Sequence, residues 1–153
     1  MTFARKLVMF CATGGYIGNI PWAPGTFGSL PGLGLAVLLA QLAAPAALMT
    51  LALFIVCAAA VAHRAEKLLD RKDAGCIVVD EMAGMAVTLM GVPLDATSVA
   101  AGFLIFRLLD IAKPFPVRFL ETAVPGGAGV VMDDVAAGIL GNVLLRVTIL
   151  VIG

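Results

Sequence analysis

Charge is scarce in this sequence, and neither sign prevails. Only 13% of its 153 residues are Asp, Glu, Lys or Arg, and the formal net charge is zero, whereas a soluble domain carries about 25% charged residues. A chain without a basic excess lacks the electrostatic footprint of a nucleic-acid-binding protein. We therefore expect no nucleic-acid partner, and we expect the few charged side chains to mark sites where the chain needs them.

Cysteine and histidine are rare as well. The three cysteines (Cys11, Cys57 and Cys76) are far apart, and no two have the CxxC spacing, which predicts free thiols rather than a disulfide framework or a zinc site. The single histidine, His63, has no companion at metal-ligand spacing and is better explained as a residue near a helix end. The chain also lacks a GK[ST] phosphate loop, a GxSxG nucleophile elbow and an HExxH zinc motif.

Apolar residues, by contrast, are abundant. They make up 61% of the chain, against about 45–50% in soluble domains, and the mean hydropathy is +1.08. Arg5-Lys6 before an apolar run resembles the start of a signal peptide, but the run is short and has no A-x-A-like cleavage site. We expect no cleaved signal here, and we expect a membrane protein with several embedded segments.

The stretch 14–29 is rich in Gly and Pro, so we expect a loop rather than a continuous helix. Thr26 and Ser29 directly precede a long apolar run, where N-cap residues belong. A loop with Gly25, Gly28 and two hydroxyls that opens a helix can also present N–H groups to an anion. The stretch therefore predicts either a capped helix start or a phosphate-binding loop with Thr26, Gly28 and Ser29 as its candidate residues.

Residues 30–62 are almost entirely apolar, with Pro45 near the middle. Pro45 marks either the turn of a hairpin or a kink in one long span. Hairpin arms of about 14 residues would be about 21 Å long, shorter than a hydrocarbon core of about 30 Å. The following residues, 63–73, are mostly charged and predict a polar, interfacial helix.

Three further helices and a short amphipathic segment follow. We expect Asp80-Glu81 to open one apolar helix, Asp95 or its neighbours to cap the next, and Asp133-Asp134 to open the last. Small residues in the last helix suit close packing, and Asn142 and Arg146 should face the bundle or snorkel to its surface. The expected segments are residues 80–90, 95–113, 117–124 and 134–152.

Tracing these helices up and down brings the polar helix ends to one side. The predicted fold is therefore all-α: a single domain over residues 1–153, forming a compact membrane-embedded bundle of short, broken helices. Nine basic residues share the polar side, and the positive-inside rule makes it the cytoplasmic face. That face gathers five carboxylates, which are Asp80, Glu81, Asp110, Asp133 and Asp134.

Carboxylates that converge in an apolar protein indicate a divalent cation, because burying them unpaired is costly. Oxygen ligands favour Mg²⁺, so these five carboxylates are the candidate metal ligands. Arg107 and Lys113 are the candidate phosphate-binding cations. The predicted chemistry is hydrolysis of a phosphate ester by Mg²⁺-assisted attack of water, although a covalent aspartyl-phosphate stays open. The candidate catalytic residues are Asp80, Glu81, Asp110 and Asp134.

Two other interpretations stay open at this point. A small transporter or channel subunit with an acidic ion site would need charges near the membrane midplane, and Asn142 and Arg146 are the only residues that favour it. A structural membrane protein would use the acidic pairs only to cap helices.

The chain resembles the phosphatidylglycerophosphatase A family over about residues 14–141. The resemblance rests on four ordered blocks: PGTFGSL at 24–30, DAGCIVVDEMAGM at 73–85, FRLLDIAKPFPVR at 106–118 and GGAGVVMDDVAAG at 126–138. It implies a Mg²⁺-dependent lipid phosphatase that converts phosphatidylglycerophosphate to phosphatidylglycerol and phosphate. It also implies a role in phospholipid biosynthesis at the inner face of the bacterial cytoplasmic membrane. The oligomeric state does not follow from the sequence.

Overall fold

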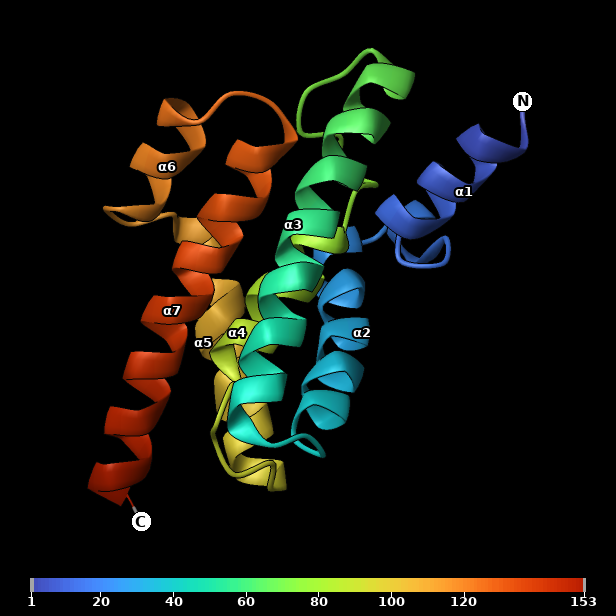
Figure 1. Ribbon diagram of the computed structural model, residues 1–153. Helices are drawn as coiled ribbons and strands as arrows, with labels where there is room; N and C mark the ends of the chain where they lie inside the picture. Colours follow the sequence, from blue (N-terminus) through green and yellow to red (C-terminus); the bar gives the residue numbers. More distant parts are fainter. Residues whose placement is uncertain (1, 153) are drawn as a thin grey trace.

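The computed structural model describes residues 2–152, except for the side chains of residues 121, 122 and 152. Over this range the chain is helical, without β-strands, and Figure 1 shows the helices arranged as a bundle with α1 and α6 at one end. The helices are α1 (Phe3–Ala12), a short 3-10 helix (Ile17–Asn19), α2 (Pro24–Leu39), α3 (Ala44–Leu69), α4 (Val79–Thr88), α5 (Ala96–Ala112), α6 (Val117–Ala123) and α7 (Gly127–Ile152). The all-α prediction is confirmed.

The short helix α4 lies at the centre, and it contacts α2, α3, α5 and α7. Its small residues allow this close packing. A Cβ atom on Gly84 would lie 2.5 Å from the ring of Phe106 in α5 and 2.7 Å from the backbone oxygen of Asp134 in α7. On α7, Gly138 meets Gly84 and Gly141 meets Thr88. The predicted small-residue packing face of the last helix is confirmed, and its partner is α4.

The contacts along α4 and α7 fix their relative direction. Gly84 meets Asp134 and Gly138, and one side-chain nitrogen of Asn142, Nδ2, donates to the backbone oxygens of Thr88 and Met90 at 2.9 Å each. Contacts therefore advance along both helices together, so α4 and α7 run parallel. This register places the start of α4 level with the second turn of α7.

Arg146 completes a polar cap at the far end of α4. Its Nη2 atom donates to the backbone oxygens of Met90 and Gly91 at 3.0 and 2.8 Å, and its Nε atom donates to Asn142 Oδ1 at 2.8 Å. These donors satisfy carbonyls that a helix end leaves without partners. Asn142 and Arg146 therefore stabilise the end of α4. They were the only residues that favoured a transmembrane ion path, so that interpretation loses its support.

The apolar region 30–62 forms a hairpin with its turn just before Pro45, which decides between the two alternatives in favour of the hairpin. The arms differ from the prediction, however. Helix α2 begins at Pro24, and α3 continues through the charged residues to Leu69. At 26 residues α3 is about 39 Å long, and the charged stretch after residue 62 forms its last turns rather than a separate helix.

The start of α2 was predicted to be a loop, and this is wrong because the segment is helical from Pro24 onward. Proline suits the first turn of a helix, where its missing N–H has no partner to lose. The N-cap is Ala23, with no side-chain cap, so Thr26 and Ser29 lie inside the helix and do not cap it. Tertiary packing outweighs the low helix propensity of the glycines: a Cβ on Gly28 would overlap the side chain of Val78.

The predicted start of α5 is confirmed, whereas the predicted start of α7 is wrong. Asp95 caps α5 as expected, accepting from the backbone nitrogens of Thr97 and Ser98 at 3.0 and 2.9 Å. Helix α7 begins at Gly127, seven residues before the expected start, so Asp133 and Asp134 lie in its second turn. Gly127 and Gly129 lie in the first turn of α7.

Two helices are long and apolar enough to cross a membrane by length and composition: Ala44–Leu69 and Gly127–Val151. They differ from the core helices of soluble proteins, which are mostly buried. Only 17% and 39% of the residues in their most apolar 18-residue stretches are buried. Large apolar side chains instead point outward, including Met49 and Val56 on α3 and Leu150 on α7. Exposed apolar surface of this extent marks contact with a partner or a lipid phase.

Candidate metal and phosphate site

Asp80 and Glu81 form the first turn of α4, after a buried non-helical connection at Ile77 and Val78. Asp80 is only 5% exposed, and its Oδ1 atom accepts from the backbone nitrogen of Glu81 at 3.1 Å. The positive end of a helix dipole favours carboxylates at this position. One such contact does not satisfy two adjacent, buried carboxylates, so the site needs further positive charge.

The third member of the cluster comes from α7. One carboxylate oxygen from each of Asp80, Glu81 and Asp134 lies within 4.8 Å of the other two. The parallel register of α4 and α7 produces this arrangement, because it brings the second turn of α7 beside the first turn of α4. Three carboxylates from two helices thus share one small volume.

A cavity of about 250 Å³ opens over this cluster. It brings together every carboxylate that the sequence singled out as a ligand, together with one predicted phosphate-binding cation and one further acid. The lining residues are Asp73, Asp80, Glu81, Asp110, Ile111, Lys113, Val130, Asp133 and Asp134. The cavity is thus almost wholly charged, which distinguishes it from the other hollows of the molecule.

Two cations are held at this site by ion pairs. Arg107 pairs with Asp110 one turn later on α5, and Lys113 Nζ lies 2.7 Å from Asp133 Oδ2. Lys113 ends α5 in the left-handed conformation, with φ of 43°. The end of α5 therefore supplies both cations and one carboxylate, and its position beside α7 joins the two halves of the site.

Burial and like charge work against ionisation here. Burial raises the pKa of the Asp80 carboxyl well above its usual range, and the neighbouring charges of Glu81 and Asp134 raise it further. Burial also raises the pKa of Glu81, and the charge of Asp110 adds to this effect. The carboxylates of α4 are therefore poorly compensated by the protein itself, despite the nearby Arg107.

The unsatisfied atoms lie in the same place. Among the described residues, Glu81 Oε2, Asp134 Oδ2 and Arg107 Nε are buried without a hydrogen-bond partner. Buried polar atoms without partners are costly, and two of these three are carboxylate oxygens of the cluster. A small hard cation with oxygen ligands would satisfy both oxygens and offset the repulsion. The residues present thus fit a divalent ion such as Mg²⁺.

The three candidates on α2 lie apart from the cavity wall. Ser29 is fully buried, and its hydroxyl donates to the backbone oxygen of Gly25 at 2.8 Å. Gly28 packs against Val78. Thr26, in the first turn of α2, is half-buried. None of Thr26, Gly28 and Ser29 is among the residues that line the cavity.

Two residues outside the predicted sets of metal ligands and phosphate-binding groups also lie at the site. Gly25 lies directly against it, since a Cβ there would be 2.5 Å from Glu81 Oε1 and 3.0 Å from Arg107 Nη2. Asp73 lies on the cavity wall and donates its backbone N–H to Glu66 Oε1 at 2.8 Å. Gly25 belongs to the stretch that the sequence assigned to a possible anion-binding loop, and Asp73 is a carboxylate of the block 73–85.

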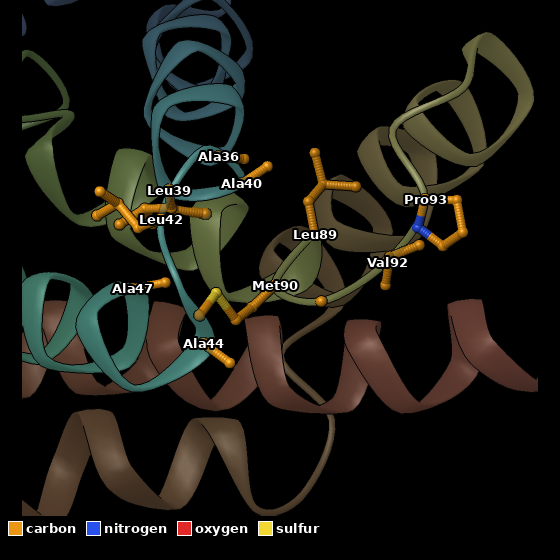
Figure 2. A pocket seen from close by; sticks show the side chains of 12 residues that line it. Ala36, Leu39, Ala40, Leu42, Ala44, Ala47, Leu89, Met90, Val92 and Pro93 are labelled. Carbon is orange, nitrogen blue, oxygen red and sulfur yellow. The ribbon is translucent and has the colours of Figure 1, made fainter.

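A larger cavity, of about 380 Å³, lies at the other end of α4. Figure 2 shows apolar side chains from the end of α2 and the start of α3, among them Leu39 and Ala44, facing Leu89 and Met90. No titratable side chain lines it. This cavity is larger than the acidic one, but no side chain in its lining can bind a metal or a phosphate. It is therefore not the candidate active site.

Comparison with known proteins places the chain in a family. The family model described as Phosphatidylglycerophosphatase A matches residues 10–149. The Escherichia coli K12 protein named "Phosphatidylglycerophosphatase A" is 39% identical over 129 residues, covering 84% of this chain and 75% of that protein. The Haemophilus influenzae protein of the same name is 35% identical over 130 residues, covering 84% and 80%.

A third relative has a different printed name. A Bacteroides thetaiotaomicron protein, "Putative phosphatidylinositol-3-phosphatase", is 38% identical over 154 residues and covers 96% of both chains. All three names describe removal of a phosphate from a phospholipid. No solved structure gives a significant match to the chain.

Proposed function

Because the chain belongs to the phosphatidylglycerophosphatase A family, we propose that it hydrolyses the terminal phosphomonoester of phosphatidylglycerophosphate. The products are phosphatidylglycerol and inorganic phosphate, which gives the protein a role in phosphatidylglycerol biosynthesis. The observation that carries the proposal is the charged cavity, in which a carboxylate cluster from α4 and α7 faces the cationic end of α5.

The proposed cofactor is Mg²⁺. Asp80, Glu81 and Asp134 would hold it, with Asp110 and Asp133 close by to bind its waters or a second ion. When bound, Mg²⁺ polarises the phosphoryl group and offsets charge that develops in the transition state. The chemistry of these ligands supports the proposal of Mg²⁺. All of them are carboxylates, and Glu81 and Asp134 each have a buried carboxylate oxygen without a hydrogen-bond partner.

The proposed phosphate-binding groups are Lys113 and Arg107. Lys113 lines the cavity, and Arg107 has a buried guanidinium atom without a partner close to Glu81. Guanidinium and ammonium groups form charge-assisted hydrogen bonds with phosphate oxygens. Of the three α2 candidates, Thr26 is the one whose side chain stays available for a phosphate. Gly28 and Ser29 act by packing, since both are engaged within the bundle.

The proposed nucleophile is water. Its oxygen attacks phosphorus, the bond to the glycerol oxygen breaks, and the leaving oxygen takes up a proton. A carboxylate of the cavity that does not bind the ion accepts the proton of the water. Attack by a carboxylate itself would instead leave a phosphorylated aspartate, which acid quenching with labelled substrate would trap.

We place the protein in the bacterial cytoplasmic membrane, with the charged cavity toward the cytoplasm. The exposed apolar surfaces of α3 and α7 support embedding, because lipid would cover them. The basic residues support the orientation. Arg5, Lys6, Arg64, Lys67, Arg71 and Lys72 lie on α1 or near the end of α3, the end of the bundle that appears at the top of Figure 1.

Phosphate release from defined lipids tests the proposed reaction. Purified protein in detergent micelles with Mg²⁺ should release phosphate from phosphatidylglycerophosphate faster than from phosphatidylinositol 3-phosphate. Faster release from the inositol lipid would keep the lipid phosphatase but overturn the proposed substrate. Folded protein that releases phosphate from neither lipid would overturn the phosphatase itself.

A further inference from the structure

A second charged groove lies away from the acidic cavity, between α1 and the end of α3. It has a volume of about 310 Å³, and its lining includes Arg5 from α1 and Arg64 and Lys67 from α3. All three side chains are exposed. Within residues 2–152, none of the three makes an ion pair. The groove shares no lining residue with the acidic cavity.

The positive charge of this groove is uncompensated. Arg64 and Lys67 are three residues apart on one helix, a spacing at which like charges repel, and the packing of α1 adds Arg5 to them. No acidic side chain lines the groove. The nearest acid in sequence, Glu66, is buried and accepts from the backbone nitrogen of Asp73. The groove is thus built to receive negative charge from outside the chain.

The same seam continues as an apolar groove. A hollow of about 340 Å³ is lined by Phe10 of α1 and by Phe54 and Val61 of α3, among others. Val61 precedes Arg64 by three residues, so the two belong to successive turns of one helix face. Since α1 and α3 run in opposite directions along the seam, the charged hollow lies at the polar end of α3 and the apolar hollow lies deeper.

We propose that this seam binds one anionic phospholipid of the surrounding membrane. Its phosphate lies against Arg5, Arg64 and Lys67, and one acyl chain lies along Phe10, Phe54 and Val61. The order of the two hollows, cationic at the membrane surface and apolar below it, matches a phospholipid and no soluble anion. The proposal takes the membrane placement given above, but it does not depend on the phosphatase reaction.

Tryptophan quenching by lipids with brominated acyl chains tests this site. The chain has one tryptophan, Trp22, so Trp22→Phe with Phe54→Trp leaves a single reporter inside the apolar hollow. The protein is placed in phosphatidylcholine vesicles that contain an equal small fraction of brominated phosphatidylglycerol or brominated phosphatidylcholine. We expect stronger quenching by the anionic lipid. Phosphatase activity with Mg²⁺ is measured separately, so that failure of the lipid site and failure of the reaction are distinguishable.

Charge-removing variants locate the binding groups. In the reporter protein, Arg64→Gln with Lys67→Gln should lower the preference for the anionic lipid about 25-fold, since each basic residue near an anionic lipid contributes about 1 kcal/mol, or about fivefold. Arg71→Gln with Lys72→Gln removes equal charge from the segment just after α3, outside the groove, and should retain the preference. Equal quenching by both lipids in the reporter protein would overturn the proposal. So would equal losses in the two double variants, because these indicate general attraction to the surface.

Discussion

Asp80 and Asp134 meet across two parallel helices, with carboxylate oxygens within 4.8 Å of each other and of Glu81. The two residues are 54 positions apart in sequence, and glycine contacts between α4 and α7 bring them level. Burial makes their mutual repulsion costly. This relationship makes the pair the centre of the proposed metal site, and it leads to the following predictions.

Neutralising either carboxylate should abolish turnover while the fold persists. Asp80→Asn or Asp134→Asn removes a ligand charge, and we expect phosphate release to fall at least about 100-fold, since even outer-shell changes at metal sites cost about 10–100-fold. Asp70→Asn is the matched control, because Asp70 is exposed and lies outside the cavity. Full activity in Asp80→Asn and Asp134→Asn would contradict the assignment.

Divalent ions should stabilise the protein in a pH-dependent way. Burial raises the pKa values of Asp80 and Glu81, so in EDTA their contribution is favourable at low pH, where they are protonated. It is lost as pH rises above the ordinary carboxyl range and both ionise. Added Mg²⁺ should therefore raise the unfolding temperature more at pH 8 than at pH 5. A Mg²⁺ effect that is equal at both pH values would contradict this origin.

Lys113 should contribute to substrate binding and to transition-state stabilisation. Loss of a charge-assisted bond costs about 1.5–3 kcal/mol, so Lys113→Met should lower kcat/KM about 10- to 100-fold. Lys113→Arg keeps the charge and should recover part of the loss. Lys72→Met, outside the cavity, serves as the control in the same phosphate-release assay. Activity of Lys113→Met equal to that of the control would rule out a role for this ammonium group.

The contact at Gly84 should tolerate no side chain. In Gly84→Ala the new methyl group would meet Phe106 at 2.5 Å and the Asp134 backbone oxygen at 2.7 Å. Separating α4 from α5 and α7 should cost about 1–3 kcal/mol and weaken activity. Gly34→Ala, on α2 with open space around it, should be neutral or stabilising. Thermal unfolding in detergent compares the two, and equal unfolding temperatures would contradict the tight packing.

The polar cap on α4 should support the site from a distance. Asn142→Ala removes donors to the Thr88 and Met90 carbonyls, and we expect a loss of about 1–3 kcal/mol. Thr148→Ala is the matched control on the same helix, because its hydroxyl bonds only to the Leu144 carbonyl within α7. Chemical unfolding measures both variants. An Asn142→Ala variant as stable as the control would show that the cap is dispensable.

Much of the site followed from the sequence because its signals are local. Adjacent carboxylates in an apolar chain, as at Asp80-Glu81, indicate a cation wherever the helices lie. The Asp95 cap of α5 is likewise encoded within four residues. Both features can be recognised without knowing which helices are neighbours. The structure contains the adjacent carboxylates at the start of α4 and the Asp95 cap of α5.

The parts that escaped prediction depend on tertiary packing. Helix α2 includes Gly25 and Gly28 because α4 and the segment before it accept a helix without side chains there, and no local propensity shows that. The early start of α7 at Gly127 has the same cause: its backbone packs directly against His63 of α3. The register of α4 against α7 likewise has no signal in either segment alone.

Binding of Mn²⁺, a divalent ion that substitutes for Mg²⁺ at oxygen sites, tests the central claim most directly. Electron paramagnetic resonance titration of wild type, Asp80→Asn and Asp134→Asn in detergent would report the bound ion without any turnover. We predict saturable binding in the wild type that is lost or greatly weakened in both variants. Unchanged binding in both variants would show that α4 and α7 do not form the metal site.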